Sequence, residues 1–403
     1  MSEPIAIKNA VRGGARDWMQ PLPWGAAVAA LVAYVILWRH GAAFAQALDE
    51  CRVPFLDFTE NYLTMARSLP DVDRVVSGFR YPPLLGILLM PLGWLGDTLA
   101  WWSWVAFQTV AVCGLIVLFA HAAQARAPRA RAGVVLLTLT AIPVLHNVAW
   151  GQISVAVTVL VVAGILSRRT WLGAALLALA SAVKVFPAIF VALGLPRRDR
   201  RAWALAWGVG LVALALAVPV AVMGPGAFWS FHRDLVAVHE NARYVTFVNP
   251  NSQFLPHVLA RWLGIPFGDP VLPWIIWGSR ASGVLLVATA ALATWRRPRR
   301  SALWALGLAL PAVPLIAPTS WPHYFAFLPG TELCLFGHLI RGRRGVATTV
   351  LLALVVVAAV IGSLPFQMMY GGWRPYAAHG ILLIADLLVV GTALALLVRN
   401  DSR

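Results

Sequence analysis

Charged residues are scarce in this 403-residue chain. Asp, Glu, Lys and Arg together make up 12% of it, whereas soluble domains carry about 25%. Hydrophobic residues make up 60%, and the mean hydropathy is +0.76. No stretch is long and polar enough to bury a core of its own. We therefore expect an all-α, polytopic integral membrane protein with one transmembrane domain over residues 1–403.

Cysteines and the motifs of soluble enzymes are scarce as well. The three cysteines, Cys51, Cys113 and Cys334, lie far apart, so no disulfide framework or metal-binding spacing is visible. The sequence has no phosphate-cradling glycine loop, no Gly-x-Ser-x-Gly and no His-Glu-x-x-His. These absences argue against redox chemistry and against the common soluble hydrolases.

Acidic residues number 16 against 32 Lys and Arg, which gives a net charge of +16. The basic residues form short blocks between apolar runs, at 126–131, 168–169, 197–201, 296–300 and 341–344. Such blocks mark cytoplasmic loops, so the charge predicts no nucleic-acid partner. It predicts a multi-pass protein of a bacterial-type inner (plasma) membrane, with cytoplasmic termini.

The apolar runs predict about ten to twelve transmembrane helices. The first, at residues 20–38, is expected to remain uncleaved although Ala43 to Ala45 faintly resembles a signal-peptidase site. It leads to a first outer loop, 40–82, which holds six acids: Asp49, Glu50, Asp57, Glu60, Asp71 and Asp73. A second outer loop is expected at 224–271.

One apolar run conflicts with this topology, because a single crossing cannot join two loops on the same side of the membrane. The blocks at 168–169 and 197–201 both look cytoplasmic, yet a single run of ordinary length, 171–195, lies between them. A broken or re-entrant helix near 171–196, bent near Lys184 and Pro187, resolves the conflict, because non-helical backbone is tolerated where protein or a watery cavity surrounds it. We expect Lys184 to lie deep and to face a cavity.

Several polar residues are expected to converge on the outer face, where each is costly to hold near lipid and marks a functional site. They are Asp57, Glu60, Arg80, Tyr81, Gln152, Asn251, Gln253 and His323. Asp57 is either a solvated loop acid or a general base, and its neighbours Phe55, Leu56 and Phe58 favour the second role because partial desolvation raises a carboxylate pKa.

The other candidates also have two interpretations. Arg80 is an interfacial anchor or a phosphate ligand, and Lys184 either faces a ligand or snorkels to a headgroup. Gln152 either bonds unpaired backbone groups at a helix end or contacts the substrate. His323 is either an interfacial histidine or a hydrogen-bond donor to a sugar or phosphate. A divalent cation is conceivable, but Asp57 and Glu60 alone supply too few ligands, so no metal site is assigned.

Six motifs in order resemble glycosyltransferase family 87 of the GT-C superfamily, over roughly residues 50–340. They are Asp57 in an outer loop, Phe79-Arg80-Tyr81-Pro82-Pro83-Leu84, Trp150-Gly151-Gln152, Gly173 through Lys184 to Pro187, Asn251-Ser252 ahead of Arg261-Trp262-Leu263-Gly264, and Ser320-Trp321-Pro322-His323. The family often has an acid before the last turn's histidine and a second histidine after it, and here Pro322 and Tyr324 stand in those places.

The resemblance implies transfer of a hexose, typically mannose, from a polyprenyl-phosphate donor to a lipid or glycan acceptor on the outer face. It makes Asp57 the general base and places His323 in the active site. With the resemblance and the polar residues taken together, we expect further substrate contacts at Glu60, Arg80, Tyr81, Gln152, Lys184, Asn251, Ser252 and Trp321. A single displacement inverts the anomeric configuration. The alternatives are a lipid or glycan transporter or flippase, a non-catalytic scaffold subunit, and an oligosaccharide ligase that uses a pyrophosphate-linked donor.

Overall fold

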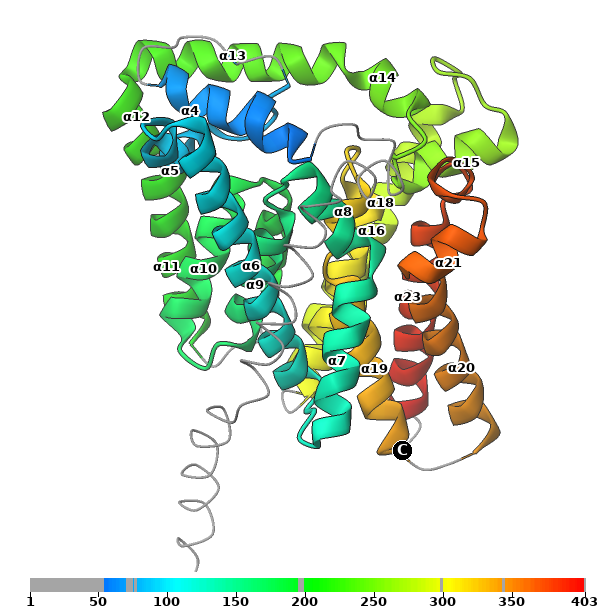
Figure 1. The fold of residues 1–403 in the computed structure, drawn as a ribbon. Helices are drawn as coiled ribbons and strands as arrows, with labels where there is room; N and C mark the ends of the chain where they lie inside the picture. The colour runs from blue at the N-terminus through cyan, green and yellow to red at the C-terminus, as the bar shows by residue number, and fades with distance from the viewer. Residues whose placement is uncertain are drawn as a thin grey trace, which may run out of the picture.

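The structure is a computed structural model that describes residues 54–69, 75, 78–194, 199–297, 300–342 and 345–401. Every named secondary-structure element in these ranges is a helix, which confirms the all-α expectation for the described part. Long helices run side by side in a bundle, and α13 (Pro225–Asn241) lies across one end (Figure 1). The expected first helix at 20–38 and the acids Asp49, Glu50, Asp71 and Asp73 lie outside the described residues.

Four helical stretches of the described chain are long and apolar enough to cross a membrane. They are α6 (Asp97–Ala122), the continuous run α11 (Arg200–Val212), η4 (Ala213–Ala217) and α12 (Val218–Met223), α16 (Leu272–Arg296), and residues Ile381–Arg399 of α23 (Ile381–Asp401). The protein is thus a helical membrane protein by length and composition, and the count of ten to twelve spans stays a prediction.

Shorter helices fill the rest of the bundle. They are α5 (Pro83–Gly93), α7 (Pro128–Thr140), α8 (Ile142–Trp150), α9 (Ser154–Leu166), α10 (Thr170–Val183), the run from α17 through η6 and η7 to α18 (Ser301–Trp304, Ala305–Ala309, Leu310–Ala312, Val313–Ile316), α19 (Leu328–Ile340) and α20 (Val346–Ile361). The helix pair α9 and α10 packs closely because it meets at two glycines. A Cβ on Gly173 would lie 2.7 Å from the carbonyl oxygen of Gly164, so a larger residue there would push the helices apart.

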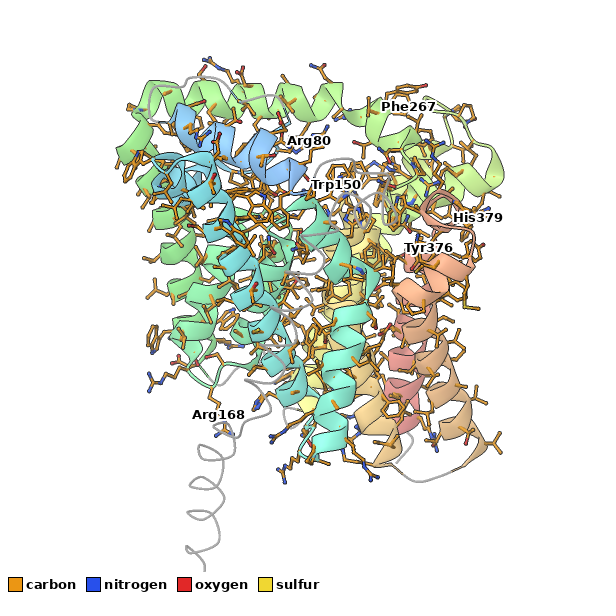
Figure 2. All side chains as sticks on the ribbon, viewed as in Figure 1. Arg80, Trp150, Arg168, Phe267, Tyr376 and His379 are labelled. Carbon is orange, nitrogen blue, oxygen red and sulfur yellow. The ribbon has the colours of Figure 1, made fainter. Side chains whose placement is uncertain are left out.

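The helix break expected near Lys184 and Pro187 is present. Helix α10 ends at Val183, Lys184 is extended (φ −147°, ψ 123°), and the 3₁₀ helix η3 (Phe186–Gly194) packs back against α10. Arg168, which precedes α10, lies at the end of the bundle opposite Arg80 and Trp150 (Figure 2). The expected break is therefore confirmed, and the return of the chain to the side of Arg168 stays a prediction.

The two expected outer loops are largely helical where they are described. The first contains a π-helix, η2 (Asp57–Leu63), followed by α4 (Thr64–Ser68). The second contains α13, α14 (Arg243–Val248) and α15 (Leu255–Leu263). These helices lie at one end of the bundle (Figure 1), where they frame the candidate site. Two short helices between α20 and α23 in the chain, α21 (Leu364–Met369) and α22 (Trp373–Ala378), complete the described fold.

Candidate active site

Asp57 begins the π-helix η2, and the local geometry explains its surroundings. Phe55 stands just before it in the left-handed region (φ 61°) and donates its backbone N–H to the Ala149 carbonyl at 2.8 Å. Phe58 stacks on Trp104 with ring centroids 4.5 Å apart. The apolar neighbours thus fix the start of η2 against α6 and α8, and Asp57 is held partly buried.

The carboxylate of Asp57 accepts two side-chain hydrogen bonds. Asn61 Nδ2 donates to Oδ1 at 2.8 Å, and Gln152 Nε2 donates to Oδ2. Burial raises the pKa of Asp57, while the bonds from Gln152 and Asn61 and the charges of His146 and Lys184 lower it. The net direction is upward, which suits a carboxylate that must take a proton from a hydroxyl group.

Gln152 follows a helix end that only glycine adopts easily. Gly151 caps α8 in the left-handed conformation (φ 68°), and a Cβ there would lie 3.0 Å from the Cβ atoms of Phe55 and Phe58. The turn points the Gln152 side chain at Asp57. Its Oε1 accepts hydrogen bonds from the hydroxyls of Tyr62, at 2.8 Å, and Tyr81, at 2.6 Å.

Buried amides hold this turn from behind. Gln108 on α6 donates its Nε2 to the Gln152 carbonyl at 2.6 Å, and Asn147 Nδ2 donates to Gln108 Oε1 at 2.9 Å. Asn147 Oδ1 in turn accepts the N–H of Val155 at the start of α9, at 3.0 Å. Trp104 Nε1 donates to the Gly151 carbonyl at 3.1 Å. The turn between α8 and α9 is therefore fixed by side chains from α6 and α8.

Two histidines meet on the far side of the cavity. His323 lies in η8 (Pro322–Phe325) and His146 on α8, with their Nδ1 atoms 3.4 Å apart and their rings stacked at 5.4 Å. A hydrogen bond between two Nδ1 atoms needs one donor and one acceptor. One of the two Nδ1 atoms therefore carries a hydrogen in this contact, and the other does not. Burial and the charges of Lys184 and His146 lower the pKa of His323, which keeps that ring neutral.

Lys184 is buried beneath aromatic rings. Its Nζ donates to the Ser154 hydroxyl at 2.7 Å and lies 3.7 Å from the Tyr324 ring centroid and 5.3 Å from that of Tyr81. Its amine group is thus surrounded by ring faces and one hydroxyl. Lys184 is not among the residues that line the cavity.

These side chains enclose a cavity of about 270 Å³. Its lining includes seven residues expected from the sequence, namely Asp57, Arg80, Tyr81, Gln152, Asn251, Trp321 and His323. Within the described ranges, the Arg80 guanidinium makes no hydrogen bond or ion pair with another side chain or carbonyl. A fixed positive charge at the cavity wall with unused N–H donors is suited to a phosphate.

Segment 249–253 closes the cavity from the side of α15. Asn251 Oδ1 accepts from Trp373 Nε1 at 2.8 Å, and Arg261 Nη2 donates to the Ser252 carbonyl at 2.9 Å. Ser252 itself is buried, and its hydroxyl lies 2.7 Å from Nδ1 of His257. Ser252 therefore supports the loop, and the side chain that faces the cavity is Asn251.

Three expected contacts lie away from the cavity wall: Glu60, Lys184 and Ser252. Gln253, which was expected on the same face, also lies off the wall. Glu60 is exposed. Within the described residues, no group of three or more His, Cys, Asp and Glu side chains is placed to hold a metal ion.

Seven lining residues were not expected from the sequence: Asn61, Tyr62, Gly78, His146, His239, Asn249 and Thr319. His146 had a usable signal, because His146 and Asn147 form a polar pair inside an apolar run, as Lys184 does. Tyr62 had none. It lies five positions after Asp57, about 140° away around a regular α-helix, and only the wider π-helix brings the two side chains to the same partner.

A family model for glycosyltransferase family 87 matches residues 79–318. Among curated proteins, the polyprenol-phosphate-mannose-dependent alpha-(1-2)-phosphatidylinositol mannoside mannosyltransferase of Mycobacterium tuberculosis is 28% identical over 306 residues, which are 70% of this chain and 66% of that protein. The protein of the same description from Mycolicibacterium smegmatis is 30% identical over 301 residues, 68% of this chain and 65% of its own length.

A third relative, a polyprenol-phosphate-mannose-dependent alpha-(1-2)-phosphatidylinositol pentamannoside mannosyltransferase of Mycobacterium tuberculosis, is 26% identical over 275 residues. The match covers 66% of this chain and 60% of that relative. The chain thus spans somewhat less than two thirds of the length of the curated relatives that it matches.

Proposed function

Since this chain belongs to glycosyltransferase family 87, we propose that it transfers a hexose, mannose first among the candidates, from a polyprenyl-phosphate donor to a lipid or glycan acceptor. The observation that carries the proposal is the pairing, in one cavity, of the hydrogen-bonded carboxylate of Asp57 with the guanidinium of Arg80. The curated relatives, whose names specify a polyprenol-phosphate-mannose donor, support the same chemistry.

In the proposed reaction, Asp57 takes the proton from the acceptor hydroxyl as its oxygen attacks the anomeric carbon. The bond between that carbon and the phosphate oxygen breaks, and the polyprenyl phosphate leaves with the electron pair. Because the lipid phosphate is already a good leaving group, the protein needs to align the two substrates and offset the phosphate charge. A single displacement of this kind inverts the anomeric centre.

We assign the phosphate to Arg80, whose guanidinium has donors to spare at the cavity wall. We assign the sugar hydroxyls to the polar groups that line the rest of the cavity, including His323, Asn251 and the indole N–H of Trp321. Lys184 contributes its positive charge from behind Tyr324, where it stabilises the ionised form of Asp57. Glu60 and Ser252 remain weaker candidates because they lie off the cavity wall.

The site belongs on the outer face of the membrane under this proposal. The cavity residues Arg80 and Trp150 lie at the end of the bundle opposite Arg168 (Figure 2), and basic loops favour the cytoplasmic side. The C-terminal end of α23 lies at the same end of the bundle as Arg168 (Figures 1 and 2), which supports a cytoplasmic position for this end of the described chain.

The decisive experiment replaces the carboxylate of Asp57 by an amide of the same size. Purified Asp57→Asn protein in proteoliposomes, supplied with radiolabelled polyprenyl-phosphate mannose and a membrane lipid extract as acceptor, should transfer no sugar, because an amide cannot accept the hydroxyl proton. Asp97→Asn is the matched control. Asp97 is highly exposed in its ion pair with Arg67, and such pairs contribute about 0 to 1 kcal/mol.

Transfer by Asp57→Asn at the rate of the control would remove Asp57 from the mechanism. A lipid flippase is the rival function. It predicts that wild-type protein moves fluorescent polyprenyl phosphate between leaflets without forming any glycosylated product, and the same proteoliposomes test this.

A further inference from the structure

Gln152 lines the cavity, yet its side-chain amide is occupied by protein groups. Its Nε2 donates to Asp57 Oδ2, and its Oε1 accepts from Tyr62 and Tyr81. We propose that Gln152 is a positioning residue whose amide, clamped by the two tyrosine hydroxyls, keeps Asp57 ionised and fixes the direction of its free lone pairs. This inference rests on the proposed transferase function and deepens it.

The two tyrosines decide which way the amide points. Each phenol donates its hydrogen to Oε1, at 2.8 Å from Tyr62 and 2.6 Å from Tyr81. With Oε1 satisfied twice, the two hydrogens of Nε2 must lie on the side of Asp57. The opposite orientation would set the amide oxygen against the carboxylate oxygen, where two acceptors repel.

The geometry leaves a defined place for the acceptor hydroxyl. Asp57 Oδ1 is bonded by Asn61 and Oδ2 by Gln152. Because each carboxylate oxygen can accept two hydrogen bonds, one direction on each oxygen stays open to the cavity. A carboxylate free to rotate would present its lone pairs over a wide range of angles, whereas this one is held at both oxygens.

The π-helix η2 contains both the proposed base and one of the two tyrosines that bond Gln152. Asp57 and Tyr62 both belong to η2, and both contact Gln152 although they are five residues apart. Hydrogen bonds from i to i+5 widen the turn and bring such residues toward one face. A movement of η2 would therefore break the contact with Asp57 and the contact with Tyr62 together.

The titratable and charged groups near Asp57 belong to several different elements. His146 belongs to α8, Lys184 follows α10, and the two phenols belong to η2 and to the segment before α5, while Arg80 and His323 line the same cavity. Among these, His146 and Lys184 favour the ionised carboxylate, and burial opposes it. Replacing Gln152 by Met, which is similar in size but donates no hydrogen bond, should raise the pKa of Asp57, because the ionised carboxylate loses a charge-assisted hydrogen bond.

The test measures the protonation of Asp57 directly as well as the rate. Infrared difference spectra of the full-length protein in nanodiscs, recorded against pH, give the midpoint of the carboxyl band that Asp57→Asn removes. Gln152→Met and Asn61→Leu should both raise that midpoint, and Tyr62→Phe should raise it by less. Thr140→Ala, which loses a hydroxyl bonded to the Leu136 carbonyl on α7, should leave it unchanged.

Steady-state transfer separates positioning from substrate contact. For Gln152→Met, positioning predicts a fall in kcat of about ten- to hundredfold, with little change in donor KM and with the acidic limb of the pH profile displaced upward. A raised donor KM with an unmoved infrared midpoint would overturn the proposal and make Gln152 a substrate ligand.

Failure of the transferase proposal has a different signature. If wild-type protein transfers no sugar but Gln152→Met still raises the infrared midpoint, the control of Asp57 by Gln152 is supported and the reaction assignment is wrong. An unmoved midpoint in both Gln152→Met and Asn61→Leu refutes the inference whatever the transfer assay shows.

Discussion

The turn at Gly151 allows a prediction that separates backbone strain from crowding. Gly151 (φ 68°) and Gly264 (φ 67°) both cap a helix in the left-handed conformation, at the ends of α8 and α15. An alanine at either position pays about the same strain, roughly 1 to 2 kcal/mol. The strain therefore cancels when Gly151→Ala is compared with Gly264→Ala.

The surroundings of the two glycines differ. A Cβ on Gly151 would lie 3.0 Å from the Cβ atoms of Phe55 and Phe58, whereas a Cβ on Gly264 would meet nothing within 4 Å. Overpacking of this kind typically costs about 1 to 3 kcal/mol. Gly151→Ala should thus be less stable than Gly264→Ala by about that amount.

The same change should also affect the reaction, because Gln152 is the next residue. Displacing the turn moves the Gln152 amide away from Asp57 and from Tyr62. We expect Gly151→Ala to lose most of its transfer activity at a temperature where it is still folded, while Gly264→Ala keeps the wild-type rate.

Two measurements check this, thermal unfolding in detergent followed by tryptophan fluorescence and transfer from radiolabelled polyprenyl-phosphate mannose in proteoliposomes. Equal melting temperatures and equal rates for the two variants would refute the reasoning, since it rests on contacts that only Gly151 makes.

Three further predictions follow from the cavity. Arg80→Ala should weaken the binding of sugar-free polyprenyl phosphate to the protein in nanodiscs about tenfold or more, because a charge-assisted hydrogen bond contributes about 1.5 to 3 kcal/mol. Lys184→Met should weaken this binding less, because Lys184 lies off the cavity wall. Transfer should fall as pH falls through the pKa of Asp57, above its usual 3.8, since the base must be unprotonated; a rate that is flat from pH 7 to pH 4 would contradict this. Trp373→Phe should raise donor KM by releasing Asn251 from its bond to the indole N–H, with kcat little changed.

Much of the helical fold follows from the pattern of apolar runs. The apolar run 272–295 of the sequence forms most of α16, and the apolar run 153–166 forms α9. The break near Lys184 was predicted by a counting argument, because two basic blocks on one side cannot be joined by one crossing. Hydropathy reports these features well because membrane helices need long apolar segments.

The helices at the cavity end were not predicted, for a physical reason. Helix α13 is less apolar than the spanning helices, and its residues read as an outer loop. Lying across the end of the bundle (Figure 1), it needs no continuous apolar length.

The sequence predicted many of the residues of the candidate site but few of the contacts between them. Asp57, Arg80 and Gln152 stood out because polar groups are costly near lipid. That Gln152 contacts Asp57 was not predictable, since it depends on a π-helix in one segment and a left-handed glycine in another. Lys184 was expected at a cavity, and the ring of Tyr324 covers it.

Three of the cavity residues come from places where the regular α-helix is interrupted. Asp57 begins a π-helix, Gln152 follows a left-handed glycine, and His323 lies in a 3₁₀ turn. A regular helix in an apolar setting satisfies its own backbone and directs its side chains outward at fixed angles, which limits how many can meet at one point. Each irregular segment escapes that limit, but the backbone groups that it frees need other partners. Gln108, Trp104 and Asn147 bond such groups on the turn from 151 to 155. These buried amide and indole groups therefore keep the base in place without touching substrate, and changes to them should reduce kcat and stability together.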